Sequence, residues 1–237
     1  MNPFLRLLFL GALLTTRLWA VNPTVAVTGP AANANIPVGS SLYLKALASD
    51  PDGFIAKVEF YVNGAFAGTV STAPYNVVYT FGSAIPTTVV ARAYDNSGAT
   101  TDSVTVNVNV VSAIGEGPNI FITSPAATDT IVSQQRVVLA ASATDSDGFI
   151  PSTVGAGVTF LLDGDPLPVL TGLPTVETNP DLTPPYTLTW NPGVAKTYDL
   201  RAQAVDDKGN IRLSPPLLIT VNSPIPTVQI VTPLDGT

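Results

Sequence analysis

Apolar and polar positions alternate with a period of two along several short runs of the chain, the spacing that sends successive side chains of a β-strand to opposite faces. In the first half, three runs keep apolar residues on one parity: Leu42, Leu44, Ala46 and Ala48; Val58, Phe60 and Val62; Val89, Ala91 and Ala93. The second half repeats these rows as Val137, Leu139, Ala141 and Ala143; Val158, Phe160 and Leu162; Leu200, Ala202 and Ala204. On the other parity of the first two runs, side chains such as Tyr43 and Tyr61 are expected to lie largely in solvent. No long stretch keeps a helical period, so the pattern predicts an all-β chain.

The chain contains the same module more than once. The segment ALASDPDGFI at 46–55 recurs as ASATDSDGFI at 141–150, and a further module opening, PTVQIV, begins at Pro226. Self-similarity of this kind is typical of tandem modules. We therefore expect a signal peptide at 1–20, a first repeat at 22–110, a linker at 111–117, a second repeat at 118–222 and the first strand of a truncated third repeat at 226–237.

The first twenty residues have the organisation of an export signal. Arg6 gives a positive start, an apolar core runs over 7–14, and Ala20 supplies a small residue at the expected cleavage point. This core is well short of the roughly 20 apolar residues that a membrane-spanning helix requires. We expect a cleaved signal peptide, a secreted or cell-surface product, and no membrane insertion of the mature chain. An uncleaved anchor is the alternative.

Composition narrows the classes of function. The chain has Cys 0 and His 0, so it lacks thiol nucleophiles, the commonest general base and any disulfide. Its formal charge of −7 becomes about −9 when Arg6 and Arg17 leave with the signal peptide, which disfavours nucleic acid and anionic lipid as partners. Paired carboxylates can serve a hydrolase, but their recurrence in two small modules favours a structural role. We therefore expect that the chain is not an enzyme.

Turn residues separate the predicted strands at 52–53, 63–64 and 96–98, a spacing typical of a seven-stranded antiparallel sandwich. The ordered pattern AxAxDxDG, then an apolar strand ending in N/D-G, then PY, then AxAxDxxG, resembles bacterial immunoglobulin-like domains of the cadherin-like and PKD-like kind. The resemblance implies two tandem immunoglobulin-like antiparallel β-sandwiches from a secreted or cell-surface protein, or from modules beside polysaccharide hydrolases. It leaves the function open, because this sandwich hosts many unrelated roles.

Departures from antibody-type domains accompany this resemblance. Phe60 and Phe160 stand where those domains place a buried Trp. Tyr198, near the start of its strand, is expected to form the tyrosine corner of such sandwiches. Its counterpart in the first repeat is Thr87, so the first repeat should lack that tie.

Six aspartates are candidate metal ligands, three in each repeat: Asp50, Asp52, Asp95, Asp145, Asp147 and Asp206. Asp50 and Asp95 continue two inward apolar rows, and Asp145 and Asp206 do so in the copy. In an immunoglobulin-like topology both rows end at the same pole, so two carboxylates should converge on one partly desolvated spot. Their repulsion there needs a compensating partner.

Two explanations of these aspartates stay open. Calcium takes six to eight oxygen ligands, including carboxylates, and the resemblance to cadherin-like modules implies the same ion. Alternatively, each Asp accepts hydrogen bonds from the backbone of its own turn. An EF-hand is excluded, because the twelfth position of the loop is Tyr61 in one copy and Ala156 in the other.

Sugar binding is the rival to a structural role. Trp190 and its counterpart Tyr79 keep an aromatic in both repeats, which favours packing over a sugar platform. Tyr43, Tyr61 and Tyr94 on the outward parity are better platform candidates, although the second repeat does not keep them.

These observations together predict a non-catalytic structural or adhesion segment, a spacer, in a larger exported bacterial surface or secreted protein. We expect a monomeric array whose partner is a cell-surface protein or a polysaccharide. The alternative is an accessory polysaccharide-binding or linker module of a secreted glycoside hydrolase. In that case the Pro-rich insertion of the second repeat, within 165–184, would carry copy-specific recognition.

Overall fold

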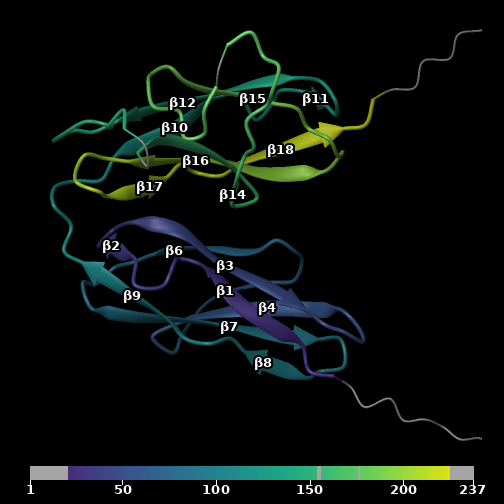
Figure 1. Cartoon of the computed structure of the whole chain (residues 1–237). Helices are drawn as coiled ribbons and strands as arrows, with labels where there is room; N and C mark the ends of the chain where they lie inside the picture. Colours follow the sequence, from purple (N-terminus) through teal and green to yellow (C-terminus); the bar gives the residue numbers. More distant parts are fainter. Residues whose placement is uncertain (1–20, 154–155, 176, 225–237) are drawn as a thin grey trace, which may run out of the picture.

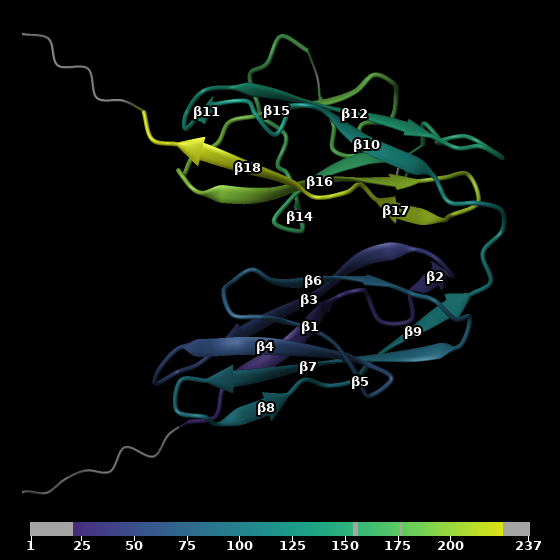
Figure 2. The same ribbon diagram turned by 180° about the vertical axis from the view of Figure 1, so that it is seen from behind.

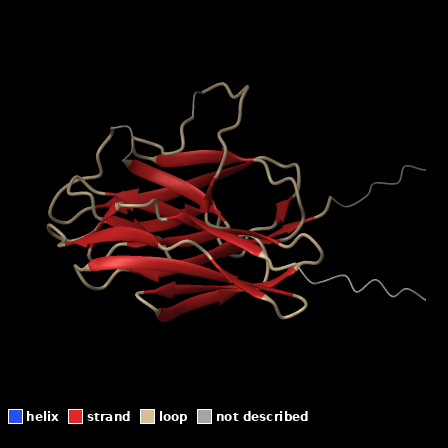
Figure 3. Cartoon of the chain, turned by 60° about the horizontal axis from the view of Figure 1, so that its bottom comes forward, coloured by secondary structure: helices blue, strands red, loops and turns tan. Residues whose placement is uncertain are grey.

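The computed structural model describes residues 21–153, 156–175 and 177–224, and the regular elements in them are all β-strands. The strands form two sandwiches, one for each predicted repeat, which confirms the all-β tandem expected from the alternating pattern (Figure 1; Figure 3). Within these residues there is no helix with the length and apolarity that crossing a bilayer demands. The predicted signal peptide and the predicted third repeat lie outside the described residues.

The first sandwich pairs a three-stranded sheet with a six-stranded sheet. Its strands are β1 (Thr24–Gly29), β2 (Asn35–Pro37), β3 (Ser41–Ser49), β4 (Ile55–Val62), β5 (Ala65–Val70), β6 (Tyr75–Thr80), β7 (Pro86–Asp95), β8 (Thr100–Asp102) and β9 (Val106–Val111). One sheet has the order β1-β3-β6, and the other has the order β2-β9-β7-β4-β5 with β8 attached to β7. Two packed sheets of this connectivity make an immunoglobulin-like sandwich.

The second sandwich repeats this arrangement strand for strand. Its strands are β10 (Asn119–Ser124), β11 (Ile131–Val132), β12 (Val137–Thr144), β13 (Gly157–Leu162), β14 (Asp165–Pro166), β15 (Tyr186–Trp190), β16 (Thr197–Val205), β17 (Ile211–Leu213) and β18 (Leu217–Asn222). Its sheets have the orders β10-β12-β15 and β11-β18-β16-β13-β14, with β17 attached to β16. The duplication seen in the sequence is therefore a duplication of topology.

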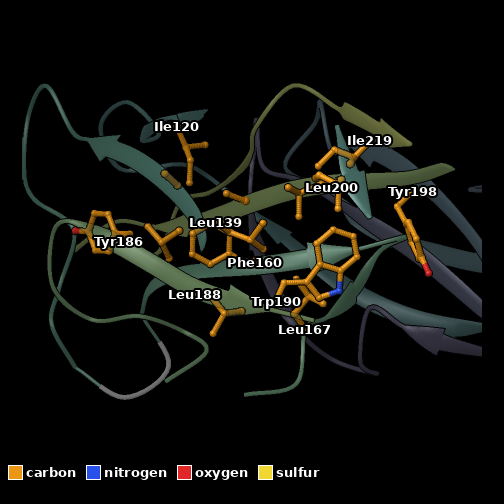
Figure 4. Close-up of a cluster of buried hydrophobic side chains, with 14 of the residues drawn as sticks. Ile120, Leu139, Phe160, Leu167, Tyr186, Leu188, Trp190, Tyr198, Leu200 and Ile219 are labelled. Atoms are coloured by element: carbon orange, nitrogen blue, oxygen red, sulfur yellow. The ribbon is translucent and has the colours of Figure 1, made fainter. Parts of the chain in front are cut away.

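The predicted inward rows meet in the core of each sandwich. Leu44 and Phe60 are fully buried in the first core, and Leu139, Phe160 and Leu200 are fully buried in the second (Figure 4). Full burial of each such side chain contributes about 1.5–3 kcal/mol. The two Phe side chains thus fill the central position that the sequence assigned to them, without the stapling disulfide of antibody domains.

The tyrosine corner predicted for the second sandwich is present. The Tyr198 hydroxyl donates to the carbonyl of Val194 at 3.0 Å, and its ring meets Trp190 edge to face at a centroid distance of 5.3 Å (Figure 4). In the first sandwich, Thr87 makes a shorter tie, because its Oγ1 donates to the carbonyl of Ile85 at 2.9 Å. Trp190 is buried, which confirms its expected packing role.

Tight turns join β4 to β5 and β13 to β14. Asn63 and Gly64 have φ angles of 50° and 78°, and Asp163 and Gly164 have φ angles of 51° and 89°. Two consecutive residues in this left-handed region make the type of hairpin turn whose twist matches the strands, and Asn-Gly and Asp-Gly adopt it readily. The turn predicted at 63–64 is therefore confirmed, and both turns join antiparallel neighbours as hairpins.

The insertion of the second repeat covers a strand edge that β5 covers in the first. Whereas β5 runs beside β4 for six residues, β14 has only two residues beside β13. Farther along β13, the side chain of Asn179 bonds both the amide and the carbonyl of Phe160, at 2.8 and 3.0 Å. The backbones of Asp181 and Val158 exchange two hydrogen bonds of 2.8 Å. These contacts satisfy edge groups that would otherwise be exposed for pairing.

The two sandwiches lie side by side, because the chain doubles back after β9 (Figure 1; Figure 2). The start of β1 and the end of β18 are at the same end of the molecule, opposite the linker between the sandwiches. Strands β3 and β6 of the first sandwich face β13, β16 and β17 of the second. The tandem is thus a folded-back pair rather than an extended row.

Tyr43 on β3 corrects the prediction that the outward parity lies in solvent. Its side chain is only 8% exposed, because it packs with Val78 against Leu161 and Leu213 of the second sandwich. The period of two gives the face on which a side chain lies. It does not say whether another domain covers that face.

Candidate functional site

Each sandwich has an acidic pole where two strands end. The first pole comprises residues 50–54, after β3, and 95–99, which begin at the last residue of β7; the second pole comprises residues 145–149 and 206–210. In the first pole the two segments are joined by a hydrogen bond from the Asn96 amide to the carbonyl of Phe54, at 3.1 Å. In the second pole, the Asp207 amide bonds the carbonyl of Phe149, also at 3.1 Å. The structure therefore brings the predicted aspartates of each repeat to one end, as the sequence pattern required.

Asp95 caps the turn that follows β7. The side chain is 4% exposed, and its Oδ1 accepts hydrogen bonds from the Ser97 amide, the Ser97 hydroxyl and the Ala99 amide at 2.9, 2.9 and 2.7 Å. Burial opposes the charged form, but these hydrogen bonds outweigh it and hold the pKa of Asp95 below its ordinary value. The turn-capping explanation therefore accounts for one oxygen of Asp95, Oδ1. The other oxygen, Oδ2, is buried and meets no hydrogen-bond donor in the described residues.

Asp50 approaches Asp95 from the end of β3. Its Oδ1 is buried and, like Asp95 Oδ2, has no donor in the part of the chain that the structure describes. Burial raises the pKa of Asp50, and the negative charges of Asp52 and Asp95 raise it further. A buried carboxylate oxygen without a donor is unfavourable unless a proton or a cation accompanies it.

Gly53 makes room for the side chains around it. A Cβ at this position would lie 2.1 Å from Asn96 Oδ1 and 2.6 Å from Asp50 Oδ2. Both distances are far below van der Waals contact, so a side chain at this position would displace Asn96 or Asp50. Gly148 stands in the same relation to Asp207 Oδ1, at 2.1 Å, and Asp145 Oδ2, at 2.6 Å. Each pole thus has two side-chain oxygens drawn together around a glycine.

Asp52 has a different partner from Asp50 and Asp95. Its Oδ2 accepts a hydrogen bond from the backbone nitrogen of Val21 at 3.0 Å. The equivalent contact in the second pole runs from the Glu116 amide to Asp147 Oδ2, at 3.2 Å. In both copies, therefore, the segment that leads into the sandwich is tied to the middle aspartate of its pole.

The second pole contains its own cation and an extra donor. Lys208 Nζ lies 2.7 Å from Asp147 Oδ2 and donates to the carbonyl of Asp147 at 2.6 Å, and the bond from Lys208 lowers the pKa of Asp147. Asp206 is 3% exposed; its Oδ1 accepts the amides of Lys208 and Asn210, and its Oδ2 accepts Asn210 Nδ2 at 2.8 Å. At the same positions the first repeat has Ser97 and Ala99. The predictions from the repeated aspartates took no account of this difference, although the aligned sequences contain it.

The linker between the sandwiches closes over the second pole. Asn210 Nδ2 donates to the carbonyls of Ile114 and Glu116, at 2.9 and 3.4 Å, and the Ser146 hydroxyl donates to Glu116 Oε2 at 3.0 Å. Gly115 packs here with a φ of 75°, where a Cβ would lie 2.1 Å from Asp147 Oδ2. The second pole is thus part of the joint between the two sandwiches.

Within residues 21–153, 156–175 and 177–224, no three Asp, Glu, His or Cys side chains gather closely enough to hold a metal ion by themselves. A cation at either pole would therefore need amide, backbone or water oxygens in addition to carboxylates, which calcium accepts. The assignment of the six aspartates as calcium ligands stays a prediction. So does the assignment of calcium as the cofactor.

The three tyrosines considered as a sugar platform make other contacts in the structure. Tyr43 is covered by the second sandwich, while the hydroxyls of Tyr61 and Tyr94 donate to Glu59 at 2.6 and 2.8 Å. A crevice of about 430 Å³ opens where the sandwiches meet, and Tyr43, Asn76 and Lys196 are among its lining residues. The period-two pattern could not have found this crevice, because it is made by two repeats together.

Comparison with protein families identifies a match over most of the chain. The family described as bacterial Ig domain matches residues 23–106 and again residues 118–202. The two matched segments correspond to the two sandwiches. Among curated proteins, none matches the chain.

Several solved structures resemble the chain at low similarity. The fibronectin(III)-like modules of Clostridium thermocellum CbhA are 23% identical, cover 84% of this chain and 95% of their own, and have a TM-score of 0.36. The Ig1-2 module of the Drosophila receptor protein tyrosine phosphatase DLAR is 9% identical, with 85% and 100% coverage and a TM-score of 0.43. Bacteroides ovatus SGBP-B, solved in complex with a mixed-linkage heptasaccharide, is 14% identical, with 85% and 48% coverage and a TM-score of 0.30. Similarity at this level concerns the fold alone.

Proposed function

This chain belongs to the bacterial Ig domain family, and we propose that it is a non-catalytic structural or adhesion segment of a larger exported protein, in which two domains are held as one unit. The observation that carries the proposal is the contact between the two sandwiches. A pair that is fixed in this way presents its surfaces in a constant relation to each other. A flexible row of domains would not do so.

An apolar cluster forms the centre of this contact. Tyr43 and Val78 from the first sandwich pack against Leu161 and Leu213 from the second, and all but the partly buried Val78 are less than 9% exposed. The guanidinium of Arg201 lies over the Tyr43 ring, 5.8 Å from its centroid. Contiguous apolar patches on a protein surface mark places where another surface binds. The two sandwiches cover each other.

Polar contacts around the cluster fix the register between the sandwiches. Asn76 Nδ2 donates to the carbonyl of Asp163 at 2.8 Å, and the Ile211 amide donates to Ser40 Oγ at 3.2 Å. Lys45 Nζ lies 2.8 Å from Asp165 Oδ1. Asp165 is largely exposed, so the ion pair contributes little energy, but it adds to the directionality of the contact.

Export is supported by the leader predicted from the sequence. The absence of His and Cys also supports a non-catalytic role.

A second function, accessory polysaccharide binding, is favoured by one observation. The crevice of about 430 Å³ between the sandwiches has both apolar and polar lining, including Pro74, Asn76, Lys196 and Thr197. Sugar chains bind to surfaces that combine these characters.

Retention experiments distinguish the two functions. The purified chain is incubated with insoluble chitin, cellulose and related glycans, and separately with bacterial and host cells. A structural or adhesion segment is expected to stay unbound on the glycans, with any retention confined to cells. Retention on a glycan that is lost in Lys196→Ala, at the crevice, but kept in Lys57→Ala, on the far face of the first sandwich, would overturn the structural proposal in favour of the accessory function.

A further inference from the structure

The middle aspartate of the first pole, Asp52, has a main-chain partner but no cation among the described residues. The Val21 nitrogen lies 3.0 Å from Asp52 Oδ2, and both residues are exposed. No ion pair of the described chain involves Asp50, Asp52 or Asp95. Burial, together with the negative charges of Asp52 and Asp95, raises the pKa of Asp50. A positive charge beside Asp52 would relieve part of this repulsion.

Strand register determines which residue stands beside Asp52. Strands β1 and β3 are antiparallel and pair Thr24 with Ser49. Val21 precedes Thr24 by three residues, and Asp52 follows Ser49 by three residues. In an antiparallel pair such positions are opposite each other. The contact between Val21 and Asp52 therefore follows from the pairing of the two strands.

The second sandwich has the same register and adds a cation. Strands β10 and β12 pair as β1 and β3 do, so Glu116 stands opposite Asp147, and its amide donates to Asp147 Oδ2 at 3.2 Å. Lys208 Nζ lies 2.7 Å from the same oxygen. The first repeat has Ser97 at the position of Lys208. The first pole thus keeps the main-chain contact of its copy without the charge.

Signal cleavage would place a charge on the Val21 nitrogen. The leader pattern, with its apolar core at 7–14 and Ala20 at its end, predicts cleavage between Ala20 and Val21. Hydrolysis of this bond by water leaves a carboxylate on Ala20, which departs with the leader, and an amine on Val21, which is protonated at neutral pH. A charged donor makes a hydrogen bond about twice as strong as a neutral donor does. The contact to Asp52 would thus become an ion pair.

The residue before this contact also differs between the copies. In the second repeat it is Gly115, which has a φ of 75° and where a Cβ would lie 2.1 Å from Asp147 Oδ2. A side chain at this position would displace Asp147. The first repeat has Ala20 at the equivalent position, and in the same arrangement its Cβ would displace Asp52. Loss of Ala20 on cleavage removes this conflict.

We propose that removal of the leader makes Val21 the cation of the first pole, where its α-ammonium pairs with Asp52. This ammonium corresponds to Lys208 beside Asp147 in the second pole. The inference rests on the export proposed above. The ion pair forms only in the processed chain, because the precursor has a neutral amide at Val21. Retention of one more residue would move the charge by about 3.3–3.6 Å, out of hydrogen-bond reach.

The charge is tested with two forms of the chain that begin at Val21, one with a free α-amine and one N-acetylated. Acetylation removes the charge and keeps the N–H donor. We expect the free form to melt about 1–4 °C higher at low salt, as suits an exposed ion pair, and the difference to shrink in about 1 M salt. Asp52→Asn should abolish the difference, whereas the matched change Asp147→Asn should leave it.

Equal melting temperatures of the free and acetylated forms would overturn the pairing, and so would a difference that persists in Asp52→Asn. Each variant is compared with its own acetylated form, so a general loss of stability in Asp52→Asn does not affect the result. A third form that begins at Ala20 is expected to melt with the acetylated chain. If it melts with the free form instead, the assignment to Val21 is wrong.

N-terminal sequencing of the chain expressed with residues 1–20 in a bacterium tests the processing step separately. The exported chain is expected to begin at Val21. An exported chain that begins at another residue would overturn this inference and leave the proposed export intact. A chain that stays in the cell with its leader would overturn the export, and the melting temperatures would still decide whether Val21 and Asp52 pair.

Discussion

The two six-stranded sheets have nearly identical inner faces and very different outer faces. In the first sandwich the outer face carries a charged network, in which the hydroxyls of Tyr61 and Tyr94 both donate to Glu59. In the second sandwich the corresponding face carries Leu161 and Leu213, which are buried against the first sandwich. Duplication has therefore preserved the parity that builds the core and has let the other parity diverge. The pairing of the two domains is encoded on the face that the core does not constrain.

This divergence gives the pair a direction. Tyr43 of the first sandwich is 8% exposed in the contact, while Val138, its counterpart in the second, is 56% exposed. The first domain thus offers its three-stranded sheet, and the second offers its six-stranded sheet. Because neither domain has both faces in the interacting form, the contact is a property of this pair and not of the module.

The largest expected loss of stability comes from the core position that the two domains share. Phe60→Ala and Phe160→Ala each remove a fully buried ring from equivalent positions and should each lower the free energy of unfolding by about 3–5 kcal/mol. Chemical denaturation followed by circular dichroism measures this loss. A loss below about 1 kcal/mol in either variant would contradict the assignment of that Phe to the centre of its core.

A smaller loss of stability is expected on the outer face of the first domain but not at the equivalent position of the second. Tyr43→Ala removes a ring from the contact between sandwiches and should cost about 1–3 kcal/mol, whereas Val138→Ala at the equivalent exposed position should stay within about 0.5 kcal/mol. Thermal unfolding of both variants provides the comparison. Equal effects would mean that Tyr43 is not buried by the second domain.

Acid should weaken the interactions on the outer face of the first domain more than those on the outer face of the second. Hydrogen bonds from Lys57 and Tyr61, with a further one from Tyr94, lower the pKa of Glu59 to about 2 from an ordinary value of 4.5. Because the pKa is depressed in the folded state, its contribution is complete above pH 4.5 and is lost as the pH falls toward 2. We expect Glu59→Gln to remove about 1–2 kcal/mol of this pH dependence, since bonds to a charged group are worth that much. The second domain has Thr159 here, so Thr159→Val is the matched control, and unfolding free energies from pH 5 to pH 2 are the measurement.

The smallest effect concerns the corner that distinguishes the two domains. Tyr198→Phe removes the hydrogen bond to Val194 and keeps the edge-on contact with Trp190, so it should cost about 1 kcal/mol. The matched change in the first domain is Thr87→Val, which removes the bond to Ile85. A neutral Tyr198→Phe variant, measured by urea unfolding, would show that the corner adds no stability.

The sequence was sufficient for what depends on local pattern. The alternating rows around Phe60 and Phe160 predicted the cores, Asn63-Gly64 predicted a turn, and Tyr198 predicted the corner. Each of these follows from residues close together in the chain or from the period of a strand. The convergence of Asp50 and Asp95 followed from the same parity once an immunoglobulin-like topology was assumed.

The sequence was not sufficient where one domain acts on another. The parity of Tyr43 was predicted, but its burial depends on Leu161 and Leu213, whose apolar character on an outward face is meaningful only beside the first sandwich. The difference between the poles was equally hidden, because the repeated aspartates drew attention away from Lys208 and its counterpart Ser97. The domain contact and the difference between the poles are encoded by residues that differ between the two copies. A search for repeats looks only at residues that the copies share.

The fixed pairing of the two domains is tested most directly by an interdomain distance distribution. Since the chain has no Cys, spin labels can be placed at two exposed positions, one in each sandwich, through Val104→Cys and Val194→Cys. Pulsed electron resonance should give one narrow distribution, which broadens when Tyr43→Ala and Leu161→Ala are added. A broad distribution in the labelled chain, unchanged by those two substitutions, would contradict the pairing.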